Sequence, residues 1–390
     1  MVLVAFNPDT DLALANGAGN YTPTEAVSQM IMDLSMLPIW YAKTGSHVLV
    51  PIGTDDEFLL KQNELFNLNI NLITVEELRS LKGPVEVSPW GWNYSFRNML
   101  KRAGISEEYL PDDAELEARR QRSQRMMVGT LLLRFAKEPG FCGISIQLTT
   151  TTDCVHAFQD MKLKGGVVFK EPWSSSGKGL MWCRDAYHVS NRNWCNRVIK
   201  TQGYVTVMPI YNKVQDFAME FYVHPDQSVE FVGYSLFETD KHGYYQGNGL
   251  LSDEEIENNL AVYVSMKRLE NTKQRVGDFL ASQGYQGWVG VDMMICKERG
   301  EMCVLPCVEI NYRQTMGMVA RVLNDQFLAH QATGTFMIEH FSNHEELVDF
   351  VEEKSKEAPL EVNGGRVKKG FMPLVPVTPT SQNLAYIEVY

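Results

Sequence analysis

Two neighbouring stretches decide the fold of this chain of 390 residues. The first is Trp288-Val-Gly-Val-Asp-Met-Met-Ile295, and the second is Met302-Cys-Val-Leu-Pro-Cys-Val-Glu-Ile-Asn-Tyr-Arg313. Each is a mainly apolar run of strand length, and the Lys297-Glu-Arg-Gly300 segment between them is typical of a hairpin turn. The sequence therefore predicts two antiparallel strands that carry a few polar side chains among apolar ones.

The polar side chains of this hairpin are expected on one face. Period-2 geometry puts Glu309, Asn311 and Arg313 on the same side of their strand, and the neighbouring strand can bring Asp292 to that side. Two carboxylates and an amide oxygen are hard donors that suit Mg²⁺ bound to nucleotide phosphates. An arginine beside them can bind a transferring phosphoryl group or an oxyanion. An ordinary hairpin with polar residues facing outward is the competing interpretation.

A second chemical motif lies upstream of the hairpin. Phe169-Lys-Glu-Pro-Trp-Ser-Ser-Ser-Gly-Lys-Gly179 places Lys170 at the end of an apolar strand, before a loop rich in serine and glycine. Backbone N–H groups of such a loop can bind phosphate oxygens, and the lysine supplies the opposite charge. A Walker A loop is excluded because Pro172 replaces its first glycine and Gly179 replaces its Ser or Thr. A plain hairpin turn stays open for this segment taken alone.

The N-terminal part, up to about residue 115, has the pattern of an α/β unit. Apolar runs of strand length alternate with helical patterns, and these runs begin at Val2, His47, Asn69 and Val85. This alternation predicts a parallel sheet with helices packed around it. The loop from Asn16 to Gly19 is similar to a dinucleotide fingerprint, but Thr22 replaces the last glycine, which argues against a nicotinamide or flavin site.

Beyond this unit, a long helix is expected from Ala114 to Lys137 and a helical stretch from Asp253 to Gln283. Strand patterns dominate from Tyr204 to Leu236. The last 25 residues contain three prolines, and we expect them to wrap the surface.

Composition and charge exclude several classes of protein. Apolar residues at 44% and charged residues at 22% are ordinary for a globular enzyme and exclude a disordered chain, a collagen and a coiled coil. A formal net charge of −12 makes nucleic acid a poor partner. No apolar run approaches the roughly 20 residues that a membrane span needs, and the N-terminus lacks the basic start of a secretory signal. Seven thinly spread cysteines fit free thiols in a reducing cytoplasm.

With these motifs in this order, the chain resembles the ATP-grasp superfamily from residue 1 to about 345. The resemblance implies an N-terminal parallel-sheet α/β domain and then a two-part ATP-grasp fold, with a small lid and a C-terminal antiparallel-sheet domain. The implied division is an N-terminal domain (1–115), a connecting helix and lid (116–206), a domain with the metal site (207–345), and a C-terminal helix with a surface tail (346–390).

The resemblance also implies roles for single residues. Lys170 would hold the α- and β-phosphates of ATP, and Arg313 would contact the transferred phosphate and the acyl-phosphate intermediate; these two are the catalytic candidates. Mg²⁺, for which Mn²⁺ could substitute, would be bound by Asp292, Glu309 and Asn311.

Two segments are expected to bind the nucleotide. The loop over the β- and γ-phosphates would consist of Ser174, Ser175, Ser176, Gly177, Lys178 and Gly179. A hinge would bind adenine through Met208, Pro209, Ile210 and Tyr211. Proline lacks an N–H, so Pro209 could only accept from the adenine amino group, whereas the Tyr211 N–H could donate to the ring. Asp216 or Gln215 would contact the ribose, and either Arg122 or Arg125 would join the phosphate site.

The implied activity is that of an ADP-forming ligase in the cytoplasm. The γ-phosphate would pass to a substrate carboxylate, and an amine or a thiol would attack the resulting acyl phosphate. The loop after the first strand would face the acceptor substrate through Asn7, Asp9, Asn16 or Asn20. Small-molecule acids and amines are the expected partners, without nucleic acid or membrane, and a homodimer is common in the superfamily. A nucleotide-binding protein without ligase activity and a phosphotransferase on the same scaffold are the open alternatives.

Overall fold

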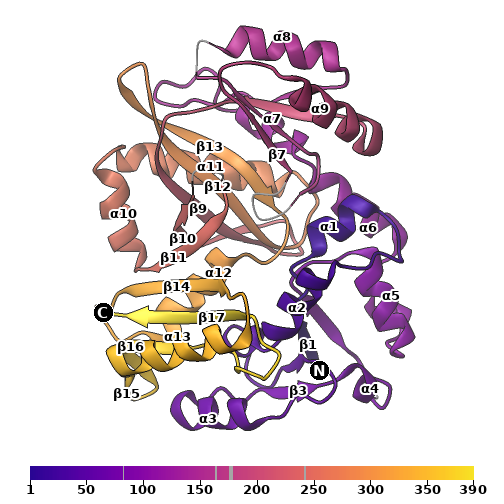
Figure 1. Cartoon of the computed structure of the whole chain (residues 1–390), viewed down its shortest axis with the longest axis vertical. Coiled ribbons are helices and arrows are strands. Elements are labelled where there is room, and N and C mark those ends of the chain that lie inside the picture. The colour runs from indigo at the N-terminus through magenta and orange to yellow at the C-terminus, as the bar shows by residue number, and fades with distance from the viewer. Residues whose placement is uncertain (82, 163–164, 175–178, 241–242) are drawn as a thin grey trace. The chain divides into compact units, whose positions relative to one another are not determined.

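A computed structural model describes residues 1–390 apart from residues 82, 163–164, 175–178 and 241–242 (Figure 1). The chain divides into two compact units. Unit 1 contains Met1–Glu117, Gln246–Ser252 and Gln314–Tyr390, and unit 2 contains Ala118–Tyr245 and Asp253–Arg313. The expected division into four parts stays a prediction. The expected C-terminal part (346–390) belongs to the same unit as the expected N-terminal domain (1–115). Among the described residues, no helix has both the length and the apolar character that crossing a membrane requires.

The parallel sheet expected at the N-terminus is present in unit 1. Its four strands run in the order β3-β2-β1-β4, and all neighbours are parallel. The strands are β1 (Val2–Ala5), β2 (His47–Leu49), β3 (Asn71–Ile73) and β4 (Glu86–Pro89). The helices around them are α1 (Thr10–Asn16), α2 (Glu25–Asp33), η1 (Leu37–Trp40), α3 (Glu57–Phe66), α4 (Val75–Leu78), α5 (Tyr94–Arg102) and η2 (Glu107–Tyr109). Local signals set helix starts here: the Asn93 side chain accepts from the Phe96 N–H and caps α5.

Unit 1 also contains an antiparallel sheet in the order β11-β14-β17-β16-β15. Its strands are β11 (Tyr245–Leu250), β14 (Gly334–His340), β15 (Glu361–Asn363), β16 (Arg366–Pro373) and β17 (Asn383–Val389). The accompanying helices are α12 (Met316–Val322), η4 (Leu323–Phe327) and α13 (His344–Glu357). The expectation of a surface tail was wrong for the last strand. Leu384 and Ile387 are fully buried because β17 pairs on both sides, with β14 and with β16.

Unit 2 contains the small sheet expected for the lid, in the order β5-β8-β6-β7. Its strands are β5 (Ile146–Leu148), β6 (Val167–Lys170), β7 (Leu180–Cys183) and β8 (Val205–Pro209). Two helices, α8 (Thr151–Met161) and α9 (Val189–Gln202), pack together over this sheet (Figure 1). Phe169 and Val207 point into the apolar core beneath them, which fixes the strand that carries Lys170.

The larger sheet of unit 2 has the order β13-β12-β9-β10 and is antiparallel. Its strands are β9 (Lys213–Val223), β10 (Val229–Thr239), β12 (Gly287–Glu298) and β13 (Glu301–Asn311). The helical stretch expected at 253–283 is two helices, α10 (Asp253–Ala261) and α11 (Met266–Ala281), which pack on this sheet. The break falls before Ser265, whose backbone is extended.

The long helix expected at 114–137 is also two helices, α6 (Asp113–Arg122) and α7 (Met126–Leu132). The expectation of one continuous helix was therefore wrong. Between them the Arg125 N–H donates to the Pro172 carbonyl at 3.0 Å, so a long-range hydrogen bond replaces the helical one.

Candidate active site

The predicted β12–β13 hairpin is present, and Asp292 lies directly opposite Glu309 after a register shift between Asp292 and Met294. Its turn is tight: Arg299 and Gly300 have φ of 52° and 90°, as a two-residue turn requires. Polar contacts follow one face of the hairpin. Asn311 Nδ2 donates to Asp292 Oδ2 at 3.2 Å, and Arg313 Nη2 donates to Asn311 Oδ1 at 2.9 Å.

The electrostatics of this face favour a bound cation. Burial raises the pKa of Asp292 to about 7, and the charge of Glu309 contributes, whereas Arg313 and Asn311 act in the opposite direction. The described residues contain no group of three or more His, Cys, Asp or Glu that could hold a metal ion. A divalent ion between these two carboxylates would therefore need further oxygen ligands from water or phosphate, which is how Mg²⁺ is usually bound.

Lys170 ends β6 and is 6% exposed. Its Nζ donates to the Val308 carbonyl at 3.3 Å. Burial lowers the pKa of Lys170 to about 8, and the Arg125 guanidinium adds to the effect, whereas the charge of Glu309 opposes it. Because burial disfavours the charged form of Lys170, a bound anionic ligand would stabilise its ammonium group.

The structure distinguishes the two arginines that the sequence left open. Arg125 is 5% exposed, and its Nη2 lies 2.9 Å from Glu309 Oε1 and 3.0 Å from Ser174 Oγ. Its Nε is buried without a hydrogen-bond partner among the described residues. Arg122 instead donates to the Gln283 carbonyl at 2.7 Å. Arg125, not Arg122, therefore lies with Lys170 and the carboxylates.

A cavity of about 350 Å³ in unit 2 joins these groups. Its charged side contains Arg125, Lys170, Asp292 and Glu309. The rest of its wall is largely apolar and includes the hinge, with Val168, Leu180, Trp182, Met208, Pro209, Ile210, Tyr211, Phe237, Met293, Met294, Leu305 and Val308. A nucleotide has a flat base and charged phosphates, and a cavity with an apolar side next to a charged side is suited to both.

The hinge is held by its own hydrogen bonds. The Ile210 N–H donates to the Gly166 carbonyl at 3.0 Å, and the Tyr211 hydroxyl accepts from the Ile144 N–H at 3.0 Å. Because the Ile210 N–H is engaged, it is unavailable to a base. Pro209 and Tyr211 carry the backbone groups proposed from the sequence, and their role in binding adenine stays a prediction.

The loop after Lys170 is described only at its ends. Ser174 is buried against Arg125, as described above, and Gly179 has φ of 71°. A Cβ at Gly179 would lie 2.6 Å from the Ser174 Cβ, so a larger residue would force the ends of the loop apart. Neither Ser174 nor Gly179 lines the cavity. The remaining candidates, Ser175, Ser176, Gly177 and Lys178, lie outside the described residues.

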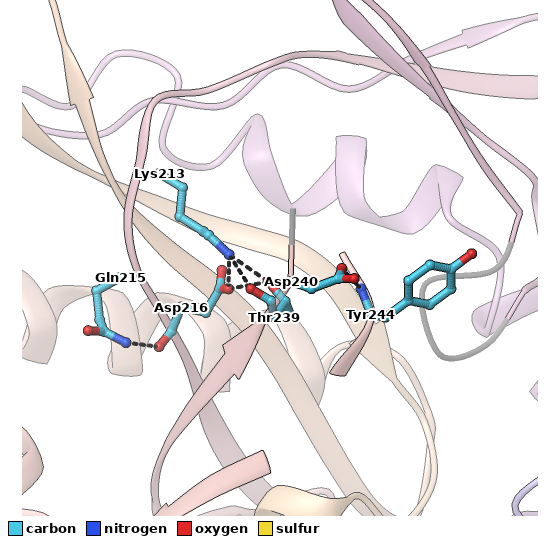
Figure 2. A network of polar contacts seen from close by, with 6 residues as sticks. All are labelled: Lys213, Gln215, Asp216, Thr239, Asp240 and Tyr244. Atoms are coloured by element: carbon cyan, nitrogen blue, oxygen red, sulfur yellow. Dashed lines mark hydrogen bonds and ion pairs between the residues drawn. The ribbon is translucent and has the colours of Figure 1, made fainter. Parts of the chain in front are cut away.

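Asp216, expected to contact the ribose, belongs to a polar network beside the cavity (Figure 2). Its Oδ2 accepts from Lys213 Nζ and from Thr239 Oγ1, both at 2.6 Å. Lys213 Nζ also donates to Thr239 Oγ1 at 2.6 Å. Gln215, the alternative ribose contact, donates to the Asp216 carbonyl at 3.0 Å. Sequence reasoning missed Lys213 and Thr239, since their proximity depends on the pairing of β9 with β10.

The network continues into the segment after β10. Asp240 Oδ1 accepts from the Tyr244 N–H at 2.9 Å, and both residues appear in Figure 2. Asp240 and Gly243 line the same cavity. With Thr239, these two residues form part of the cavity wall.

Of the comparisons with known proteins, only the search of solved structures gives matches. No family model and no curated protein matches the chain. Among solved structures, it is similar to N5-carboxyaminoimidazole synthetase from Staphylococcus aureus complexed with ADP, with a TM-score of 0.51 at 11% identity, covering 100% of this chain and 93% of the other. For biotin carboxylase from Campylobacter jejuni the TM-score is 0.52 at 11% identity, with 100% and 87% covered.

A third similar structure is the biotin carboxylase domain of Hydrogenobacter thermophilus 2-oxoglutarate carboxylase, with a TM-score of 0.50, 12% identity, and 100% and 86% covered. At these identities the likeness concerns the fold. The sheets of this chain match the architecture expected from the sequence: a parallel sheet at the N-terminus, a small lid sheet, and an antiparallel sheet that carries the acidic hairpin. The chain therefore has the fold of the ATP-grasp superfamily, as its sequence resemblance predicts.

Proposed function

We propose that the protein is an ATP-dependent, ADP-forming ligase that activates a substrate carboxylate as an acyl phosphate for attack by an amine or a thiol. One observation carries the proposal. A single cavity places two buried cations, Arg125 and Lys170, beside two carboxylates, Asp292 and Glu309, and continues into an apolar hinge. A site for a purely apolar ligand has no use for these four charges, which are costly to bury.

The nucleotide would lie along this cavity. The base fits the apolar side, between lid residues such as Val168 and Met208 and residues of the large sheet such as Leu305. The phosphates fit the charged side, where the Lys170 ammonium is a counter-ion on a flexible stem. The Nε of Arg125, which has no hydrogen-bond partner among the described residues, is a donor that a phosphate oxygen could satisfy.

The acidic face of the hairpin would hold Mg²⁺, or Mn²⁺ in its place. Asp292, Glu309 and Asn311 are the candidate ligands, and their oxygens are of the type that these ions prefer. When bound, such an ion neutralises negative charge on the phosphates.

The protein would contribute mainly placement and charge to the transfer of the phosphoryl group. Lys170, Arg125 and Arg313 would stabilise the negative charge of the phosphates and of the acyl phosphate, because phosphoryl transfer through a loose transition state asks for little else. The loop that begins at Ser174 and ends at Gly179 would cover the phosphates and exclude water from the acyl phosphate.

A double substitution in the acidic hairpin tests the proposal. Asp292→Asn with Glu309→Gln should lower Mg²⁺-dependent ADP release about 100-fold or more, the order typical for the loss of electrostatic stabilisation at a reacting phosphate. The matched control is Glu298→Gln with Glu301→Gln, since these carboxylates are paired in register at the other end of the same hairpin. The control should keep wild-type turnover, and circular dichroism should show that both double variants are folded.

The assay screens ADP release with pools of carboxylic acids, with and without pools of amines or thiols. ADP release that requires both pools supports a ligase, whereas release that needs only one acceptor indicates a phosphotransferase. Turnover that is unchanged in the folded Asp292/Glu309 variant would remove the metal assignment. ATP binding without any turnover would leave a nucleotide-binding protein.

A further inference from the structure

Unit 1 contains a cavity of its own, of about 290 Å³, at the carboxyl ends of its parallel strands. Phe6, Asn7 and Asp9 follow β1, Val50 follows β2, and Asn93 follows β4. In the order β3-β2-β1-β4 the chain leaves β1 toward β2 on one side, while β4 lies on the other. Open α/β sheets bind ligands outside the strand ends at such a reversal of strand order.

Several polar groups of this cavity are committed to holding its loops. Asn7 Nδ2 donates to the Gly91 carbonyl at 2.7 Å, and the Gly91 N–H donates back to Asn7 Oδ1 at 3.4 Å. Asn93 caps α5 as described above, and Ser95 Oγ donates to the Tyr21 carbonyl at 3.0 Å. These bonds rigidify the wall and leave few polar groups for a ligand.

Asp9 is different. Its carboxylate has no salt bridge with any described residue, and it does not cap α1. Burial raises the pKa of this carboxyl, and the neighbouring charge of Asp11 contributes, while the Asp9 backbone N–H opposes the shift. Burial and the charge of Asp9 raise the pKa of Tyr21 to about 12, so its phenol keeps its proton at neutral pH. A partly buried carboxylate without an ion-pair partner favours a ligand that brings a positive charge.

The remaining wall selects the sign and the shape of the ligand. The described residues that line the cavity include no Lys, Arg or His, so an anion would meet only the negative charge of Asp9. Most of the surface is apolar and comes from Ala5, Phe6, Pro23, Ile31, Leu49, Val50, Pro51, Val75, Phe96 and Met99. A cation with an apolar body matches both features.

We propose that this cavity binds a primary ammonium group carried on a compact apolar body, with Asp9 as its counter-ion and the Tyr21 hydroxyl beside it. The substrate carboxylate has no partner in this cavity. The use of this amine as the attacking nucleophile rests on the proposed ligase function, whereas its binding does not.

Binding is tested on the full chain without nucleotide, by calorimetric titration. The probe is 2-phenylethylamine, compared with its neutral analogue 2-phenylethanol and its anionic analogue 3-phenylpropanoate. The amine should bind at least about 10-fold more tightly than either analogue, the order expected for a hydrogen-bonded charge pair out of water. Equal or tighter binding of the carboxylate would overturn the inference on the wild-type protein alone.

Two variants locate the site. Asp9→Asn should weaken binding of the amine at least about 10-fold, while Asp55→Asn, which removes an exposed carboxylate from the same unit, should not. Ile31→Phe keeps Asp9 but fills part of the cavity and should also weaken binding. Equal affinity of the Asp9 and Asp55 variants for the amine would refute the assignment.

The test separates this inference from the proposed function. The Asp292/Glu309 double variant should bind the amine with wild-type affinity even when it has lost ADP release. A protein that fails to bind amines but still turns over ATP would refute this inference and leave the proposed ligase in place.

Discussion

Replacing Lys170 with Met should stabilise the protein while weakening its binding of ATP. Folding lowers the pKa of Lys170 from 10.5 to about 8, mainly through burial. At 1.36 kcal/mol per pKa unit, a shift of about 2.5 units costs the folded protein about 3 kcal/mol at neutral pH. Met has a similar length and no charge to bury. Loss of the hydrogen bond to the Val308 carbonyl removes about 1 kcal/mol, so the net gain in unfolding free energy is about 2 kcal/mol.

The sign of the pH dependence follows from the same shift. Because the pKa of Lys170 is lower in the folded state, the unfolded chain binds more protons between about pH 8 and pH 10.5. The cost of the buried ammonium is therefore complete below pH 8 and disappears as the pH rises through that window. The advantage of Lys170→Met over wild type should shrink by about 2 kcal/mol between pH 7 and pH 9.5.

Urea unfolding at pH 7 and pH 9.5 measures the stability of both proteins, and calorimetry measures ATP binding. The affinity for ATP should fall by roughly 1.5–3 kcal/mol, as expected for the loss of a hydrogen bond between charged groups. Lys200→Met, on an exposed face of α9, is the control and should change neither quantity. A Lys170→Met protein that is less stable than wild type at pH 7, or whose stability difference does not vary with pH, would refute this reasoning.

Two further predictions concern the wall of the same cavity. Arg125→Gln should lower turnover about 100-fold, whereas Arg122→Gln, which removes a guanidinium outside the cavity, should leave kcat near wild type in the ADP-release assay. Lys213→Met should cost about 1–3 kcal/mol in urea unfolding, because the buried Asp216 carboxylate loses its counter-ion and keeps only the hydroxyl of Thr239. Adding Asp216→Asn should recover part of that loss, and a purely additive cost in the double variant would count against the pair.

The sequence by itself determined those features that depend on neighbouring residues. The β12–β13 hairpin is one, because its turn and its period of two residues put Asp292 on the same face as Glu309, although the direct pairing of the two also depends on a register shift between Asp292 and Met294. The parallel sheet is another, because alternating strand and helix patterns leave few other arrangements. The position of Lys170 at the end of a buried strand could likewise be read from the apolar run before it.

Only the tertiary structure decided the features that depend on distant segments. Arg122 and Arg125 have the same local pattern, and the choice between them depends on a hydrogen bond from Arg125 to Pro172, far along the chain. The pairing of Lys213 and Asp216 with Thr239 requires β10 to lie beside β9. The burial of β17 follows from two strand partners that its own residues do not specify. Local periodicity determines which face of a helix or strand is polar. The element that packs against that face is determined by contacts between residues far apart in the sequence, and a short stretch of sequence does not specify them.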